Sequence, residues 1–300
     1  MKCLLKLSLY LILTPLAFAL VGDLCQKQTK GFRLQNIYPA QDYKTASSNK
    51  EPGPEEFASI EKILKQPFRF IKKGQQCFVF LSDDGKYVIK FFRWEKLEPP
   101  IWTKWIPGAL SESLIQNRQR KLDFDFLSYK IALENLQEET GLIYLQPVGT
   151  PYFKAPIEIY DNIGIRHSVQ ADKTGFILQK KAEDFFPFFK EKTREGKEKD
   201  LRPFLSALVD LIENRVQNKI TDSDVSLEYN MGVLDGKPIL FDIGNLQIDS
   251  SSLSKLDLMK KQAALILSSL RKLSPDSALF LEKELELRSD HSNSQITPCK

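Results

Sequence analysis

The pattern of apolar and polar positions divides the chain into a strand-rich first half and a helix-rich second half. Short runs of aromatic and β-branched residues, bounded by turn residues, predict strands over 68–71, 77–81 and 87–92. The sequence Asp83-Asp84-Gly85-Lys86 is typical of a hairpin turn between the last two of these. Further apolar runs predict strands over 141–145, 175–179 and 237–241.

Helical spacing of apolar residues predicts a helix that starts at Pro54, a helix over 122–138, and a strongly periodic helix over 201–218. Two more helices are expected near 254–272 and 276–288, the last with a start signal at Ser274 and Pro275. Residues 97–117, rich in Pro and Trp, have no clear period. Strands followed by helices indicate an α+β fold that could form two lobes.

The N-terminus has the pattern of a secretory signal. Lys2 and Lys6 precede the apolar run 7–19, which ends in Ala17-Phe18-Ala19. We expect cleavage after Ala19 and export of the protein, secreted or periplasmic. The alternative is an uncleaved membrane anchor, although the run is shorter than the ~20 residues that a spanning helix needs.

Charge and cysteine content exclude several classes of protein. The formal charge is +4, and removal of residues 1–19 lowers it by two, so nucleic acid is not an expected partner. Cys25, Cys77 and Cys299 are too far apart for a disulfide framework, which leaves either one bridge between Cys25 and Cys299 or three unpaired thiols.

A glycine-containing hairpin leads into an apolar strand with one lysine. Gly74 follows the first expected strand, and Lys90 lies among Val88, Ile89, Phe91 and Phe92. A lysine buried there would need an anionic partner such as a phosphate. The alternatives are a simple turn at Gly74 and a lysine that points to solvent, as every second residue of a strand can.

An asparagine and an aspartate with oxygen side chains flank the expected strand 237–241. Asn230 precedes Asp242 by twelve residues, and Asp242 is followed by Ile243-Gly244. Magnesium prefers such oxygen donors and uses few protein ligands besides phosphate oxygens. The alternative is that Asn230 is a turn residue and Asp242 a strand-end cap.

These motifs, in this order, resemble those of the protein-kinase-like superfamily over about residues 66–245. The resemblance implies a bilobal α+β fold, with a small antiparallel β-rich N-lobe at about 66–179 and a reduced helical C-lobe at about 180–288. Residues 20–53 are then a linker, 54–288 the whole kinase-like domain, and 289–300 a disordered tail. ATP and Mg²⁺ are the implied cofactors, with Lys90 holding phosphates and Asn230 and Asp242 holding the metal.

The resemblance also assigns the surroundings of the nucleotide. Gly74 and Val79 would cover it, while Lys72 and Cys77 replace the outer two glycines of the loop. Leu178 would be the gatekeeper, and Gln179 and Lys180 the hinge that offers backbone groups to adenine. Of the acids on the helix over 122–138, Asp125 is the first choice as carboxylate partner of Lys90, ahead of Asp123 and Glu134; a solvated helix face is the alternative.

The expected catalytic loop departs most from the family. The family's Asp lies five residues before the Asn, where this chain has Val225; Asp224 lies six before and Asp222 eight before. A one-residue bulge would let Asp224 orient the attacking hydroxyl. Only 58 residues follow Asp242, and no Ala-Pro-Glu motif occurs, so a peptide-binding platform is not expected.

Two hypotheses follow. In the first, an exported kinase-like protein binds ATP and Mg²⁺ and transfers phosphate to a non-peptide substrate. In the second, it is an inactive pseudokinase-like module that engages a protein or, if residues 1–19 stay attached, a membrane partner. With only His167 and His291 in the chain, a serine or cysteine hydrolase triad is not supported, and no Cys/His cluster has zinc spacing.

Overall fold

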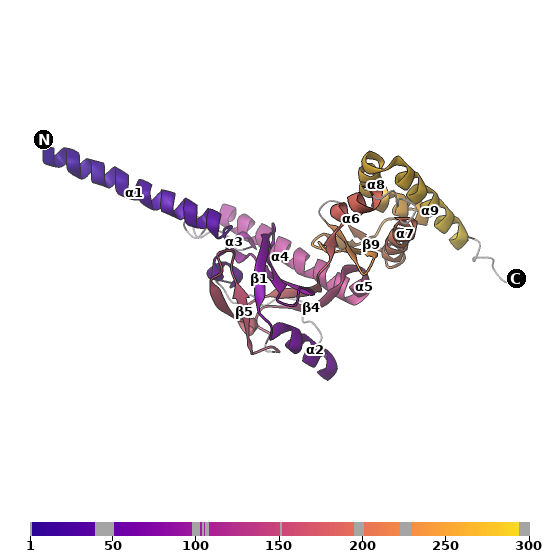
Figure 1. The fold of residues 1–300 in the computed structure, drawn as a ribbon, viewed down its shortest axis with the longest axis horizontal. Coiled ribbons are helices and arrows are strands. Elements are labelled where there is room, and N and C mark those ends of the chain that lie inside the picture. Colours follow the sequence, from indigo (N-terminus) through magenta and orange to yellow (C-terminus); the bar gives the residue numbers. More distant parts are fainter. Residues whose placement is uncertain are drawn as a thin grey trace. The chain divides into compact units, whose positions relative to one another are not determined.

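The computed structural model describes residues 2–39, 51–97, 103, 105, 108–150, 152–194, 201–222 and 230–293. The chain forms two compact units: residues 1–119 with 146–178, and residues 120–145 with 179–300. Strands dominate the first unit and helices the second (Figure 1). The predicted α+β class is confirmed.

The first unit is built around a meander of three strands. Its elements are α1 (Lys2–Gln28), η1 (Leu34–Ile37), α2 (Pro54–Leu64), β1 (Phe68–Lys73), β2 (Cys77–Ser82), β3 (Tyr87–Phe92), α3 (Trp94–Leu97), the start of α4 (Ala109–Asn135), β5 (Pro156–Tyr160), β6 (Arg166–Gln170), η3 (Ala171–Lys173) and most of β7 (Phe176–Lys180). The three strands of the meander and the α2 helix confirm the elements that the apolar pattern predicts.

One seven-stranded sheet has the order β4-β7-β3-β2-β1-β5-β6, where β4 spans Leu142–Gln146. Both pairings of the meander are antiparallel, whereas β5 runs parallel to β1 and forms a hairpin with β6. The β5–β6 hairpin was not predicted, because its strands contain few aliphatic residues: Ile157 and Ile159 in β5 and Val169 in β6.

One face of the meander is aromatic. The rings of Phe78 and Phe80 on β2 lie edge-on to Phe32, at centroid distances of 5.2 and 5.4 Å. Phe91 of β3 packs in turn on Phe80 and Phe176. Residues opposite one another on neighbouring strands share a face, so the Phe78–Phe91 pair lies on the same aromatic face.

The segment over 20–53, expected as a linker, includes ordered contacts. Phe32 and Ile37 are buried, and Thr174 donates a hydrogen bond to the Ile37 carbonyl. The segment begins within α1, a continuous helix whose large apolar side chains from Leu13 to Leu24 are exposed, among them Phe18 and Leu20. Within the described residues, no helix is long and apolar enough to cross a membrane.

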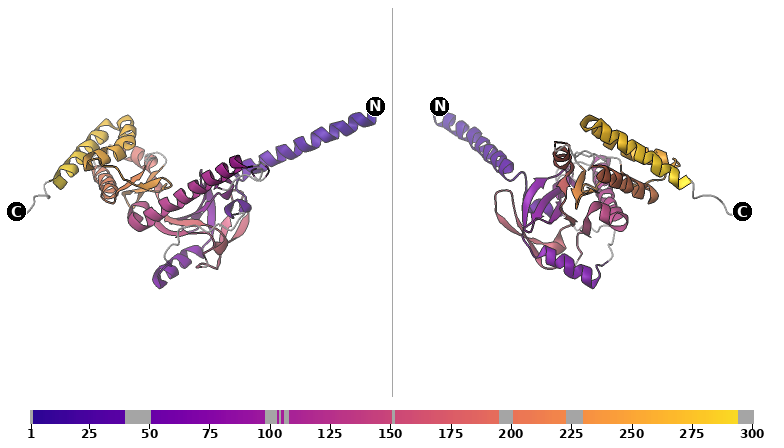
Figure 2. Two further views of the ribbon diagram at one scale, coloured as in Figure 1. Left: turned by 180° about the vertical axis from the view of Figure 1, so that it is seen from behind. Right: turned by 45° about the vertical axis from the view of Figure 1, so that its right-hand side comes forward.

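The second unit contains the rest of α4, α5 (Gln137–Thr140), β4, β8 (Glu183–Asp184), α6 (Phe185–Arg194), α7 (Arg202–Gln217), β9 (Ile220–Asp222), β10 (Met231–Leu234), β11 (Lys237–Leu240), β12 (Leu246–Ile248), α8 (Lys255–Leu273) and α9 (Pro275–Asn293). Helices α7, α8 and α9 pack together, with α8 and α9 antiparallel (Figures 1 and 2). Two small sheets, β11-β10-β8 and β12-β9, complete the unit.

Three boundaries differ from the prediction. Helix α4 begins at Ala109, 13 residues before the expected start, because the segment 97–117 lacks an apolar period but still contains helix formers. It ends at Asn135, and α5 is terminated by Gly141 in the left-handed conformation, with φ of 62°. Helix α9 continues to Asn293, so residues 289–293 are helical where a disordered tail was expected.

Candidate functional site

The turn between β1 and β2 is short, and its backbone is largely paired. Gly74 donates its amide hydrogen to the Cys77 carbonyl at 2.8 Å, which closes the hairpin over residues 74–77. An added Cβ on Gly74 would lie 3.2 Å from that carbonyl oxygen. The amide of Gly74 is therefore committed to the turn, which restricts what this glycine can offer to a phosphate.

Val79 and Lys90 are brought together. They are directly opposite one another in the β2–β3 ladder and so project from the same face of the sheet. Both are buried, with 5% and 9% of their surface exposed. Burial of Lys90 argues against the alternative of a solvent-facing strand lysine. This face is opposite to the aromatic face that carries Phe78 and Phe91.

Strand β7 contains the expected gatekeeper and hinge. Leu178 is fully buried, and the Gln179 side chain donates to the Thr140 carbonyl at 2.5 Å. The side chain of Lys180 is exposed, and its amide donates to the Gly141 carbonyl at 2.8 Å. The amide of Lys180 is thus already engaged, so a hinge contact to adenine would have to use other backbone groups.

The hairpin β10–β11 places Asn230 beside Asp242. The strands pair from Met231–Leu240 to Leu234–Lys237, and Asp235 and Gly236 form a two-residue turn with positive φ at both positions. At the open end, the Asn230 carbonyl accepts from the amides of Phe241 (2.9 Å) and Asp242 (3.4 Å). Asn230 is buried and the Asp242 side chain is exposed. The amide and carboxylate oxygens of this pair are a donor set that suits Mg²⁺.

The chain after Asp242 is held by a residue that sequence analysis missed. Ser128 of α4 is fully buried; its hydroxyl donates to the Ile243 carbonyl and accepts from the Leu246 amide at 2.8 Å. A serine within a helix gives no sequence signal for such a long-range role. Its two bonds fix the direction in which the backbone leaves Asp242.

Asp125, one turn before Ser128 on α4, is buried in the same unit. Burial raises the pKa of its carboxyl from 3.8 to about 7; the nearby Lys121 opposes that rise and the charge of Asp242 adds to it. Asp125 is therefore close enough to Asp242 to sense its charge. The predicted pairing of Asp125 with Lys90, which belongs to the first unit, stays a prediction.

The expected catalytic aspartate, Asp224, lies in 223–229, outside the described residues. Asp222 ends β9, is largely buried, and pairs with Leu246 of β12. The Arg215 guanidinium of α7 is completely buried. Its nitrogens have no hydrogen-bond partner in the described part of the chain. Burial lowers the pKa of Arg215 to about 10, while the charge of Asp222 counteracts that effect.

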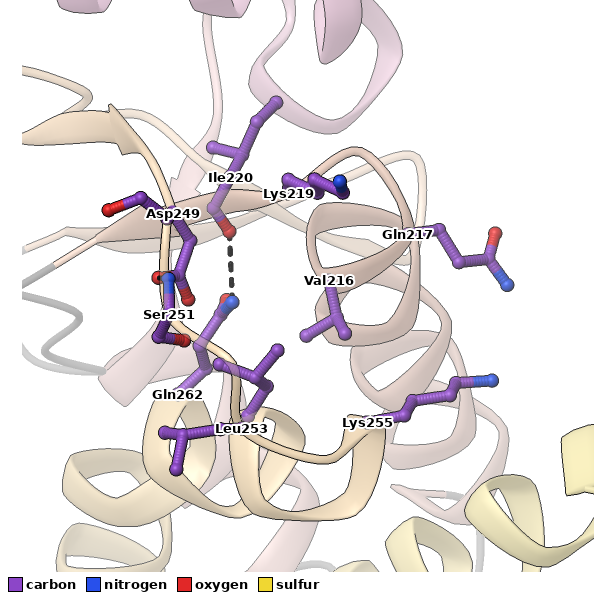
Figure 3. A pocket seen from close by; sticks show the side chains of 11 residues that line it. Val216, Gln217, Lys219, Ile220, Asp249, Ser251, Leu253, Lys255 and Gln262 are labelled. Atoms are coloured by element: carbon purple, nitrogen blue, oxygen red, sulfur yellow. Dashed lines mark hydrogen bonds between the residues drawn. The ribbon is translucent and has the colours of Figure 1, made fainter.

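A separate pocket of about 380 Å³ lies in the second unit, between the end of α7, the start of β9 and the start of α8 (Figure 3). Val216, Leu253 and Gln262 are among its lining residues, and Gln262 donates to the Ile220 carbonyl at 2.9 Å. None of the predicted site residues lines it. Within the described ranges, no group of three or more His, Cys, Asp or Glu is arranged to hold a metal.

Comparison with known proteins gives weak likenesses. No family model matches the chain, and no curated protein matches it. Among solved structures, WbdD in complex with the kinase inhibitor LY294002 has a TM-score of 0.38 and 16% identity, covering 74% of this chain and 45% of that one. A structure of the bifunctional kinase-methyltransferase WbdD has a TM-score of 0.30 and 17% identity, with the same coverage.

The chain therefore spans less than half the length of these WbdD chains. Likenesses of this size are too weak to assign a family. The order of elements is informative in itself: a three-stranded meander with a buried lysine on its third strand, then α4, β4 and β7, then α7 and the two small sheets β11-β10-β8 and β12-β9. This succession agrees with the α+β class that the sequence predicts.

Proposed function

We propose that this protein binds ATP with Mg²⁺ and transfers phosphate to a non-peptide substrate. Lys90 would pair with the phosphates, and Asn230 and Asp242 would hold the metal. The observation that carries the proposal is the open end of the β10–β11 hairpin, where the Asn230 carbonyl accepts from the Asp242 amide and so brings these two residues together.

Burial of Lys90 opposite Val79 supports the phosphate side of the proposal. The Lys90 ammonium and the Val79 side chain thus share one face of the sheet, where the first would pair with phosphates and the second would pack on the base. Bound Mg²⁺ would neutralise charge on the phosphates. The chain's own residues supply position: in this type of chemistry, most of the rate enhancement comes from alignment and electrostatic stabilisation.

A second candidate is an inactive module that uses the same fold to engage a protein. It is favoured by the engaged amides of Gly74 and Lys180, since neither can donate to a nucleotide without breaking a bond in its own unit. Export through residues 1–19 remains part of both proposals, and an active enzyme would then need delivery into a compartment that contains ATP.

Thermal-shift titration with ATP and Mg²⁺ tests nucleotide binding. We expect a rise in Tm that depends on both components and is lost in Lys90→Met and in Asp242→Asn. The matched controls are Lys86→Met and Asp235→Asn, which change exposed residues in the turns of the same two hairpins. Equal shifts in site and control variants would refute the site, and the absence of any shift for the wild type would refute ATP binding.

Phosphate transfer then separates the two candidates. Purified protein with γ-labelled ATP is offered glycans, lipid head groups and small metabolites, and labelled product is counted. We expect transfer that falls by at least 100-fold in Asp224→Asn, as for removal of a positioned general base. Nucleotide binding without transfer to any acceptor class would favour the inactive module.

A further inference from the structure

Arg93 follows directly after β3 and has an unusual set of partners for a residue that sequence analysis did not single out. It is 5% exposed, and one guanidinium nitrogen donates to the carbonyls of Gly74 (2.7 Å) and Gln75 (3.3 Å). Its backbone amide donates to the Gln76 carbonyl at 2.8 Å. Arg93 thus donates hydrogen bonds to three successive carbonyls of the β1–β2 turn.

The side of the sheet on which these bonds lie can be identified. The Arg93 guanidinium stacks on the Phe78 ring, 5.2 Å from its centroid, and Phe78 belongs to the aromatic face of the meander. The carbonyls of Gly74 and Gln75, which meet this guanidinium, are therefore turned toward the aromatic face. Val79 and Lys90 project from the opposite face.

In a trans peptide, the C=O and the following N–H point in opposite directions. Carbonyls of Gly74 and Gln75 that turn toward Arg93 therefore send the N–H groups of Gln75 and Gln76 toward the side of Lys90. Successive backbone N–H groups that point the same way form a concavity that favours anions. The nearby Glu95 carboxylate, 2.8 Å from Arg93 Nε, balances the buried charge.

The geometry points to Arg93 as a positioning residue for the phosphate chain of the bound nucleotide. It fixes the turn so that the amides of Gln75 and Gln76 face the phosphates, in a loop where Lys72 and Cys77 stand in place of glycines. The inference rests on the proposed nucleotide binding and deepens it, because Arg93 itself touches no phosphate and acts through the backbone that it holds.

The experiment compares ligands with and without phosphates in the full chain. Affinities for ATP–Mg²⁺ and for adenosine are measured by calorimetry for the wild type, Arg93→Met, Arg93→Lys and the control Arg69→Met. Arg69 is an exposed arginine on β1 that pairs with Asp83. Arg93→Lys keeps the charge but not the fork of donors, so it tests the role in a variant that is less disruptive to the fold.

We expect Arg93→Met to weaken ATP binding about tenfold or more, as for loss of a charge-assisted hydrogen bond. Arg93→Lys should show a smaller loss, and affinity for adenosine should stay unchanged in both. Equal loss of ATP and adenosine affinity, or wild-type ATP affinity in both variants, would overturn the positioning role and leave ATP binding intact. Failure of the wild type to bind ATP would overturn the proposed function, and the positioning role with it.

Discussion

The hairpins β1–β2 and β10–β11 carry residues of the proposed nucleotide site, and they are held in different ways. The β1–β2 turn is organised by a buried side chain, Arg93, which reaches the turn from the end of β3. The β10–β11 hairpin is organised by its own ladder and two-residue turn, and the chain beyond it by Ser128. The β1–β2 turn has weak local turn signals and is stabilised by a side chain from outside the turn. The β10–β11 turn has Asp-Gly at its tip, which favours a tight hairpin turn without such help.

This difference bears on function. A backbone hairpin with an ideal turn is rigid from local interactions alone, which suits oxygen ligands that must keep a fixed separation for a metal. A turn held by one guanidinium depends on that group and can be changed by a single substitution. The two hairpins are therefore expected to respond differently to mutation.

The largest effect expected is on the pH dependence of the second unit. Because burial raises the pKa of Asp125 from 3.8 to about 7, its carboxyl contributes stability that is fully present below about pH 4 and lost as the pH rises through 7. A rise of about three units in this pKa corresponds to at most about 4 kcal/mol of unfolding free energy. Asp125→Asn should reduce the pH dependence of the free energy of unfolding. At pH 8 the variant should therefore unfold at a higher urea concentration than the wild type.

Urea titrations at pH 4, 6 and 8 measure this effect. Asp123→Asn, an exposed position on the same helix, is the control and should retain the wild-type slope. A wild-type stability that stays constant between pH 4 and 8 would contradict the raised pKa.

Ser128→Val should have the next largest effect. Valine removes the hydroxyl and leaves the Ile243 carbonyl and Leu246 amide buried without that partner, at a cost of about 3 kcal/mol for the two groups. Binding of Mg²⁺–ATP should weaken as well, since the chain after Asp242 loses its anchor. Chemical denaturation measures the first effect and calorimetry the second.

The control for that variant is Ser250→Val, an exposed serine of the same unit. If Ser128→Val were as stable as this control, the two buried hydrogen bonds would contribute nothing to the unit.

The smallest losses of stability are expected for alanine substitutions at two glycines, Gly232 and Gly74. An added Cβ on Gly232 of β10 would lie 2.6 Å from the Glu183 carbonyl and 2.9 Å from the Phe241 ring, so Gly232→Ala should cost about 2 kcal/mol. On Gly74 the closest atom is 3.2 Å away, and Gly74→Ala should cost less than about 1 kcal/mol. The denaturation midpoints of the two variants, compared with that of Gly85→Ala, measure which substitution destabilises the protein more.

Gly85 serves as a third reference because it has a positive φ of 71° with open space around it, so its cost is conformational alone. A greater loss for Gly74→Ala than for Gly232→Ala would contradict the packing of both hairpins.

Much of the fold follows from local sequence. The meander and its turn at Gly85, α7 and β11 could be predicted because a strong apolar period and turn residues agree over each of them. The β5–β6 hairpin, α6 and the short strands β9 and β12 could not. Strands of two or three residues owe their existence to pairing partners that lie far away in sequence.

The candidate site divides along the same line. Two features follow from hairpin register, which is a local property: Val79 lies opposite Lys90, and Asn230 lies opposite Phe241, next to Asp242. The roles of Arg93 and Ser128 depend on which distant backbone groups each side chain meets, and residue type gives no sign of it. The hydrogen bond from the Lys180 amide to the Gly141 carbonyl likewise joins residues far apart in the sequence and could not be predicted from residue type.

The ladder of β10 and β11 also constrains how this stretch of sequence can change over evolutionary time. With four paired residues on each strand and two in the turn, the hairpin sets Asn230 opposite Phe241, the residue before Asp242. A single inserted or deleted residue would shift one strand by one position and send Asp242 to the opposite face. Insertions and deletions are therefore tolerated here only in matched pairs, one residue on each strand.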